Sequence, residues 1–517
     1  MPSFPNTGQV ALTRWSNFHH TIVDRAVPEY LTPGVESADE PALCAALNAI
    51  LARCVASQTR LCTVGSRWSL SDIIEPADVI LDPGAWNQIA AVEPTWLSAS
   101  YRQRAAQSGG VPVVVQGGTQ IRTLNQSLGS AGLSLQVSGA SDGHRMAGCI
   151  ATGTHGSHLK VGAVHDTVLA VNLVTGPGRA VLLQPSARNF GPELAQWFGR
   201  RTGLSTSDCA DDGLFAAAQV ALGGLGFVHA VVLEAEPLYQ WRGVNVARSL
   251  NDPGIWRALE TLDTRALHPL ADPDYLSLIF APFAGNSSHG CTATLMWKNP
   301  PVEPYSPAQP VQPTTSSDTS RLLSRLIPCL DGGLIGEALS EVITAQTRAE
   351  YPAGPIAPVF ASAFFGPTTL PEGNGRSTEV VVDHKDAGPA VQAVLRALQR
   401  EAAAGRHLLG GVGVRFSPAT RAHLGMNIHA MNTYIEIPSL GSAATTIIQR
   451  AVWRELKEAN IGFACHWGQE YGMDQASVRA YYGERVERWK HARTQLLDSP
   501  ALRAVFTNPL LTRLGLA

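Results

Sequence analysis

Two glycine-rich segments of this sequence have the composition of loops that hold a ligand through the main chain. Residues 63–72 read TVGSRWSLSD, and residues 139–157 read GASDGHRMAGCIATGTHGS. Glycine lets the backbone approach a ligand closely, and successive main-chain N–H groups form a concave nest for phosphate oxygens. A stretch as long as the second one, if it lacks regular structure, is usually functional. We therefore expect both segments to bind the phosphates of a dinucleotide.

Two other motifs predict different chemistry. Residues 139–143 (GASDG) match the G-x-S-x-G elbow of serine hydrolases, which makes Ser141 an alternative nucleophile. That elbow launches a helix, whereas the residues that follow here are rich in glycine and threonine, which are poor helix formers. Residues 224–226 (GLG) begin like a Rossmann fingerprint, but His229 stands where the third glycine belongs. Both alternatives are therefore weaker than the dinucleotide interpretation.

The composition predicts a soluble protein of two or more domains, because 517 residues exceed what one core usually holds. Its net charge of −3 and the lack of a like-charged run argue against nucleic acid and membrane-surface partners. We find no run apolar and long enough to span a bilayer and no signal peptide at residues 1–10. The eight cysteines lack metal-finger and C-x-x-C spacing, so we expect free thiols in the cytoplasm and no metal site.

The pattern of apolar residues predicts the elements that position these segments. Strands are expected at 60–64, 79–81, 111–116, 168–174, 180–183, 227–234, 377–383 and 414–416. Helices are expected at 42–56, 123–130, 216–221, 389–402, 443–459 and within 479–516. The character of the chain changes after Pro237, and the proline-rich stretch 299–317 is expected to be irregular. This mixture indicates an α+β or α/β protein.

Four segments in fixed order resemble the aldonolactone oxidase and alditol oxidase group of the vanillyl-alcohol-oxidase, or PCMH-type FAD-binding, superfamily. They are residues 15–18 (WSNF), 63–72, 146–157 (MAGCIATGTHGS) and 465–468 (CHWG). The TGTHGS sequence, followed much later by HWG, is the most specific part. The similarity covers most of residues 12–235 and 461–517, and the middle of the chain only in patches.

The resemblance implies an α+β fold with a PCMH-type FAD-binding domain of two subdomains. An α+β cap, or substrate, domain with an antiparallel sheet would interrupt it and close over the flavin. The expected boundaries are 1–237 for the FAD-binding domain, 238–464 for the cap and 465–517 for the return to the FAD-binding domain.

The resemblance also implies which residues contact FAD. They are Val64, Gly65, Ser66, Arg67, Trp68, Ser69, Gly139, Ser141, Ala147, Gly148, Ala151, Thr152, Gly153, Thr154, His155, Gly226, Val228 and His466. Two alternatives stay open: His155 is equally well explained as a structural histidine, and Gly226 and Val228 as part of a tight helix-to-strand turn. His466 is either a base for alcohol oxidation or a brace for the flavin ring.

The sequence departs from the family at three positions. Trp68 aligns with the histidine that many relatives link covalently to the flavin, and indole forms no such link, so we expect FAD to be non-covalent. The cap motif E-x-R is represented by residues 413–415 (GVR), which keep Arg415 but not the carboxylate. The lysine of HWGK is replaced by Gln469. Simple sugar alcohols are therefore doubtful substrates, and a larger or more apolar alcohol is expected.

The expected function is FAD-dependent oxidation of a CH–OH group in a small organic or secondary-metabolite substrate. Arg415 would stabilise developing alkoxide and reduced flavin, and a surface or salt-bridged arginine explains it equally well. Gly139 aligns with a position over the flavin where glycine leaves room for molecular oxygen, which predicts an oxidase that makes hydrogen peroxide; a glycine that closes a turn with Ser138 is the equal alternative. The alternatives are a serine hydrolase that uses Ser141 and a non-catalytic flavin-binding protein.

The tryptophan at position 68 generates the first prediction. The purified protein should be yellow and should release all of its FAD into the supernatant after acid or heat denaturation, because Trp68 offers no nitrogen for a covalent bond. Absorbance of the supernatant and the pellet measures this. Colour that stays with the precipitated polypeptide, or a protein that stays colourless with added FAD, would contradict it.

Overall fold

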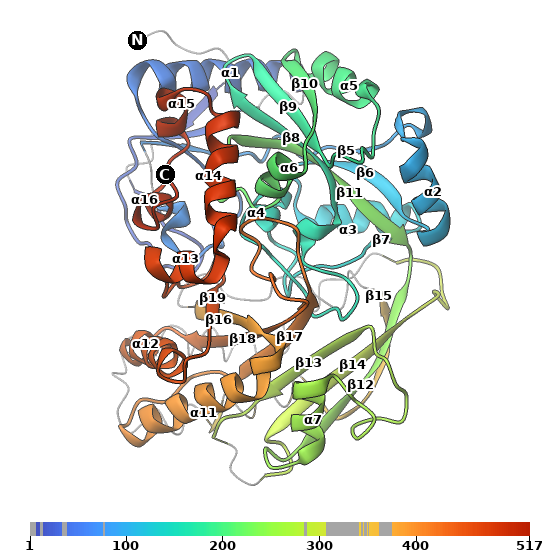
Figure 1. Ribbon diagram of the computed structural model, residues 1–517, viewed down its shortest axis with the longest axis vertical. Helices are drawn as coiled ribbons and strands as arrows, with labels where there is room; N and C mark the ends of the chain where they lie inside the picture. Colours follow the sequence, from blue (N-terminus) through green and yellow to red (C-terminus); the bar gives the residue numbers. More distant parts are fainter. Residues whose placement is uncertain are drawn as a thin grey trace.

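The computed structural model describes residues 7–10, 14–33, 39–75, 78–283, 287–306, 341–342, 345, 349, 351–360 and 375–517. In this part of the chain, helices and strands mix throughout and the strands form three sheets (Figure 1). The expected mixture of helix and sheet is confirmed. Residues 307–317 of the proline-rich stretch lie outside the described residues.

The first sheet has the strand order β1-β2-β4-β3. Its strands are β1 (Thr7–Val10), β2 (Glu29–Pro33), β4 (Val79–Leu81) and β3 (Leu61–Thr63), and β2 and β3 both pair with β4 in parallel. Helix α1 (Glu40–Ser57) buries Leu47 and Leu51 in one core with β4. By length and composition alone, α1 is long and apolar enough to span a membrane. The expectation that no segment of the chain is long and apolar enough is corrected.

The second sheet has the order β10-β9-β8-β11-β6-β5, and β7 also pairs with β11. The strands are β5 (Ile89–Ala91), β6 (Val111–Gln116), β7 (Leu133–Leu135), β8 (Val168–Gly176), β9 (Arg179–Gln184), β10 (Ser205–Ala210) and β11 (Phe227–Pro237). The predicted hairpin of β8 and β9 is confirmed. The helices of this region are α2 (Ala99–Ser108), α3 (Ile121–Ser130), α5 (Pro192–Thr202) and α6 (Asp212–Gln219).

The long glycine-rich segment contains a helix that we did not expect. Residues Met146–Ala151 form α4, which buries Met146, Cys149 and Ile150 in the core. Glycine and threonine lower helix propensity, but packing of these apolar side chains overrides it. Gly153 follows with φ of +77°, a left-handed conformation that lets the chain turn sharply after the helix.

The third sheet is antiparallel throughout, with the order β15-β12-β14-β13-β17-β18-β16-β19. The strands are β12 (Gln240–Arg248), β13 (Tyr275–Phe280), β14 (Cys291–Asn299), β15 (Gly354–Phe360), β16 (Gly375–Asp383), β17 (Val412–Pro418), β18 (Met431–Leu440) and β19 (Phe463–Cys465). Helices α7 (Pro253–Thr261), α11 (Ala387–Ala403) and α12 (Ala443–Glu458) lie along the side of this sheet that faces away from the other two sheets (Figure 1). The domain boundaries at 237 and 464 stay predictions.

Four helices at the end of the chain return to the first two sheets (Figure 1). They are α13 (Gln475–Tyr482), α14 (Glu484–Leu496), α15 (Pro500–Val505) and α16 (Pro509–Arg513). The indole of Trp489 donates to the Val220 carbonyl, and the Asn508 amide donates to the Leu222 carbonyl. These bonds fix the turn between α6 and β11 against the C-terminal helices.

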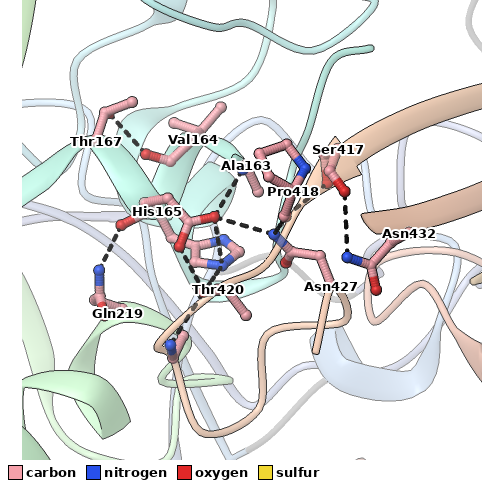
Figure 2. Close-up of polar contacts among 12 residues, drawn as sticks. Ala163, Val164, His165, Thr167, Gln219, Ser417, Pro418, Thr420, Asn427 and Asn432 are labelled. Atoms are coloured by element: carbon pink, nitrogen blue, oxygen red, sulfur yellow. Dashed lines mark hydrogen bonds and ion pairs between the residues drawn. The ribbon is translucent and has the colours of Figure 1, made fainter. Parts of the chain in front are cut away.

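A buried polar cluster joins the glycine-rich segment to the third sheet (Figure 2). Asp166 of the short helix η3 (Val164–Thr167) accepts hydrogen bonds from the Ala163 N–H at 2.8 Å, the Thr420 hydroxyl and the Asn427 amide at 3.1 Å. The Val164 N–H donates to the Thr154 carbonyl at 2.9 Å. The cluster therefore fixes the end of the glycine-rich segment relative to the chain between β17 and β18.

The aspartate at position 166 is expected to stabilise the whole protein. Asp166→Ala leaves three buried donors without their acceptor, which should lower the free energy of unfolding by about 3 kcal/mol. Glu484→Ala, at a side chain that is 86% exposed, is the control and should change it by less than about 0.5 kcal/mol. Urea unfolding midpoints measure both, and equal midpoints for the two variants would rule out the proposed role of the cluster.

Candidate active site

One large cavity lies between the glycine-rich segments and the third sheet. Its volume is about 1070 Å³, at the upper end of the range for small-molecule sites. Loop residues 61–70, the second glycine-rich segment and residues 221–223 line one end, and side chains of β13, β16, β17 and β18 line the other. The segments expected to bind FAD and the third sheet therefore line one cavity.

The residues expected to contact FAD come together in this cavity. Those that line it are Val64, Gly65, Ser66, Arg67, Trp68, Ser69, Gly139, Ser141, Ala147, Gly148, Ala151, Thr152, Thr154, His155, Gly226, Val228 and His466. Gly153 is the exception, because a Cβ there would point at the Met426 Cε, 3.0 Å away. Gly153 turns the chain beside the cavity, and its contact with FAD, like the roles of the others, stays a prediction.

Two unsatisfied donors mark the loop end of the cavity as suited to phosphate. The Oγ of Ser66 and the Nε of Arg145 are buried and have no hydrogen-bond partner. The NH1 of Arg145 also pairs with the Oδ1 of Asp82 at 2.9 Å. Only glycine at position 84 leaves room for this guanidinium, because a Cβ there would lie 2.4 Å from NH1. A bound pyrophosphate would satisfy both orphan donors, so these residues fit a dinucleotide.

A charged cluster occupies the other end of the cavity. Arg415 on β17 lies 3.3 Å from Glu379 on β16 and 2.6 Å from Glu436 on β18. Burial lowers the pKa of Arg415, but the two carboxylates outweigh this and raise it well above its ordinary value. The guanidinium is therefore a fixed positive charge within the cavity.

The sheet register supplies a carboxylate that the sequence of β17 lacks. Gly413 stands directly opposite Glu436, and Glu436 stands directly opposite Glu379. The Glu436 carboxylate accepts hydrogen bonds from Gln469 at 3.3 Å and from Ser377 at 3.2 Å. The glutamate absent from position 413 is thus replaced from the neighbouring strand, and Gln469, in the place of the family's lysine, binds it.

The hydrogen bonds of His466 determine which ring nitrogen carries its proton. Its Nδ1 accepts from the Gly468 N–H at 3.0 Å, so the proton of the neutral ring sits on Nε2. Burial lowers the pKa of His466 to about 4, although Glu379 raises it in part. At neutral pH this side chain is therefore an uncharged hydrogen-bond donor, and a role as general base is disfavoured.

His155, Glu379 and His466 place one possible ligand atom each within 4.8 Å of one another, a spacing that would also suit a metal ion. Protein groups already bind part of this cluster: Nδ1 of His466 accepts from Gly468, Nε2 of His155 lies 3.0 Å from Glu379, and Arg415 supplies a countercharge for Glu379.

The comparisons with known proteins agree with this geometry. Residues 39–184 match the family model described as an FAD binding domain. An L-gulono-1,4-lactone dehydrogenase of Mycobacterium tuberculosis is 27% identical over 220 residues, which are 42% of this chain and 41% of that protein. An alditol oxidase of a Streptomyces species is 30% identical over 128 residues, 25% of either chain. The chain thus matches about two-fifths or less of the length of these relatives.

A solved structure extends the likeness to nearly the whole chain. The crystal structure of cholesterol oxidase from B. sterolicum superimposes with a TM-score of 0.70 over 99% of this chain and 98% of that one, at 14% identity. At this identity the likeness shows a shared fold.

Residues 39–184 are therefore a PCMH-type FAD-binding domain.

Within this domain, aromatic rings surround Trp68, which is predicted to stand where many relatives carry the histidine that links to the flavin. The ring of Trp68 stacks on Phe18, with centroids 4.6 Å apart, and lies 4.7 Å from that of His144. Burial lowers the pKa of His144, and it lowers that of the adjacent His19 to about 4, so both are uncharged at neutral pH. Trp68 is thus held rigidly at the cavity wall.

Three residues of this flavoprotein fold were missed or undervalued by sequence reasoning. Glu379 and Glu436 carry no motif, and only the pairing of β16, β17 and β18 brings them to Arg415. Arg145 stands next to the MAG sequence, but nothing in the sequence shows that its aliphatic stem packs against Gly65 of the first loop and its guanidinium against Gly84.

The orphan donor on Arg145 generates a prediction for cofactor affinity. Arg145→Met removes a charged hydrogen bond worth about 2 kcal/mol, so the Kd for FAD should rise roughly thirtyfold. Arg122→Met is the matched control, because Arg122 pairs with Asp142 and does not line the cavity. Titration of the apoprotein with FAD measures both, and an unchanged Kd for Arg145→Met would remove this residue from the cofactor site.

Proposed function

We propose that this protein is an FAD-dependent oxidoreductase that oxidises a CH–OH group of a small organic or secondary-metabolite substrate. One observation carries the proposal: the two glycine-rich segments and the cluster of Glu379, Arg415 and Glu436 line the same cavity. FAD, when bound, supplies a two-electron acceptor for the hydride of the reacting carbon and passes the electrons on to molecular oxygen, giving hydrogen peroxide. Gly65–Ser69 and Gly148–Thr154 would hold it non-covalently, within a two-subdomain domain that a cap closes.

Each residue of the charged cluster has a separate role in removing the hydroxyl proton of the substrate. Arg415 stabilises the negative charge that develops on the substrate oxygen, and the Nε2–H of His466 donates a second hydrogen bond. Glu379 is 1% exposed, which leaves a substrate hydroxyl little access to its oxygens, so it does not accept the proton. Glu436 is 17% exposed and receives the substrate hydroxyl proton while the carbonyl forms.

The cap side of the cavity favours a substrate with an apolar body. Leu278, Ile279, Ile356, Leu409 and Leu440 line it. The polar side chains there already bind one another in part, since the Thr294 hydroxyl donates to Asn245 at 2.7 Å. A larger alcohol with one reacting hydroxyl fits this wall better than a small polyol does.

The structure gives less support to the two alternative functions. The His144 ring faces the Ser141 carbonyl oxygen, and Asp142 is bound at both oxygens by Arg122, so neither is positioned for a hydrolytic triad. A flavin-binding protein without catalysis is indicated by the missing carboxylate and the missing lysine; Glu436 supplies a carboxylate opposite Gly413, whereas Gln469 stands at the lysine position. The seven described cysteines are free, which supports our proposal of a cytoplasmic location.

The function is tested by anaerobic reduction of the bound flavin with a panel of alcohols, lactones and aromatic metabolites. At least one alcohol should bleach the visible spectrum, and Glu436→Gln should slow that bleaching by roughly a hundredfold or more while FAD stays bound. Glu484→Gln on the surface is the control and should bleach at the wild-type rate. Equal rates for the Glu436 variant and the control would exclude Glu436 as the proton acceptor.

The glycine at position 139 generates a prediction for the reaction with oxygen. A Cβ at Gly139 would lie 2.6 Å from the Cγ2 of Thr154, so Gly139→Ala alone forces Thr154 to move. Thr154→Ser removes that methyl group and serves as the matched background. We expect Gly139→Ala with Thr154→Ser to slow reoxidation by oxygen far more than reduction by substrate, in stopped-flow comparison with Thr154→Ser. Equal reoxidation rates in the two proteins would rule out an oxygen path past Gly139.

A further inference from the structure

Both ring nitrogens of His155 face hydrogen-bond acceptors. Nδ1 lies 2.8 Å from the carbonyl oxygen of Gly156, and Nε2 lies 3.0 Å from the Oε2 of Glu379. A carbonyl oxygen only accepts, so Nδ1 carries a proton. Nε2 faces a carboxylate, which also only accepts while it is ionised. One further proton must therefore lie between His155 and Glu379.

The second partner of Glu379 decides where that proton resides. Arg415 NH1 lies 3.3 Å from the Oε1 of the same carboxylate. Burial raises the pKa of Glu379, but His155 and Arg415 outweigh it and lower the pKa below its ordinary value. An ionised Glu379 leaves the proton on Nε2, which makes the ring an imidazolium.

The charge balance of the cluster supports the same assignment. Glu379 and Glu436 stand directly opposite each other on neighbouring strands, where like charges destabilise a sheet. Arg415 neutralises one of the two carboxylates. With a neutral His155 the cluster would keep a net negative charge in a buried place, whereas an imidazolium brings the net charge to zero.

The surroundings of His155 suit a buried cation. Its side chain is 2% exposed, and its ring stacks on that of Tyr434 with centroids 3.6 Å apart, so the ring face of a π-system covers the charge. The titratable or charged groups that face it are Glu379 on β16, Arg415 on β17, Tyr434 on β18, His466 after β19 and His165 on η3. Burial raises the pKa of Tyr434 well above its ordinary value, and burial lowers those of His165 and His466, so Glu379 and Arg415 are the charged neighbours.

We propose that His155 carries a proton on both ring nitrogens and acts as a positioning residue that neutralises Glu379, so that the charge of Arg415 remains directed at Glu436 and the cavity. This inference rests on the proposed function in one respect. The charge of Arg415 that His155 keeps available would stabilise the negative charge that a bound flavin gains on reduction. The protonation of the ring itself is independent of the cofactor.

The protonation is tested by nitrogen NMR of the full-length protein labelled with ¹⁵N-histidine, at about pH 7.5. One histidine should show both ring nitrogens protonated, and its signals should vanish in His155→Gln or shift in Glu379→Gln. A spectrum in which no histidine carries both ring protons would overturn the proposal, whether or not either variant folds.

The role in charge balance is tested with sulfite, an anion that adds to oxidised flavins and leaves negative charge on the ring. His155→Gln should raise the Kd for sulfite roughly tenfold, Glu379→Gln should lower it by a similar factor, and the double variant should return towards the wild-type value. Loss of packing alone would move both single variants in the same direction, and that result would overturn the proposed role.

The flavin content of the protein is measured first, so that a failure of the proposed function can be distinguished from a failure of the role proposed for His155. A protein that holds no FAD would refute the proposed function, and the NMR spectrum would then decide the protonation by itself. A flavin-loaded protein whose sulfite Kd is the same in all variants would leave the proposed function intact and refute the role of His155.

Discussion

Two glutamates placed opposite each other on adjacent strands govern the arrangement of the site. Glu379 and Glu436 pair in register, and mutual repulsion would favour loss of one charge unless cations compensate them. Arg415, on the strand next to Glu436, reaches both. His155, from the glycine-rich segment, contacts the outer carboxylate and so connects the charged cluster to the segment expected to hold the flavin. The two ends of the cavity are therefore connected through one set of ion pairs.

The contact between His155 and Glu379 requires that the loop after α4 keep a fixed position relative to the third sheet. The loop after α4 must stay in place for His155 to meet Glu379, and the Asp166 cluster fixes that loop against the chain between β17 and β18. The C-terminal helices in turn fix the turn before β11 through Trp489 and Asn508. The Asp166 attachment thus joins the second glycine-rich segment to the chain between the strands that carry Arg415 and Glu436.

The sequence predicted the parts of the site that lie in local motifs. The two glycine-rich segments, Arg415 and His466 all stand in short patterns whose chemistry is readable from neighbours in the chain. Glu379 and Glu436 were not predictable, because strand register alone places them beside Arg415. Helix α4 was missed for the opposite reason: local propensity argued against it, and burial of Met146, Cys149 and Ile150 overrode that propensity. The proton position on His466 required the Gly468 N–H, which only the folded turn supplies.

The most direct measurement of the central claim is a crystal structure of the protein grown with FAD. The account predicts a dinucleotide whose pyrophosphate contacts residues 65–69 and 148–154 and the Arg145 side chain, with the flavin ring at the end of the cavity that holds Arg415 and His466. A cavity without flavin, or a flavin ring placed away from Arg415, would contradict it.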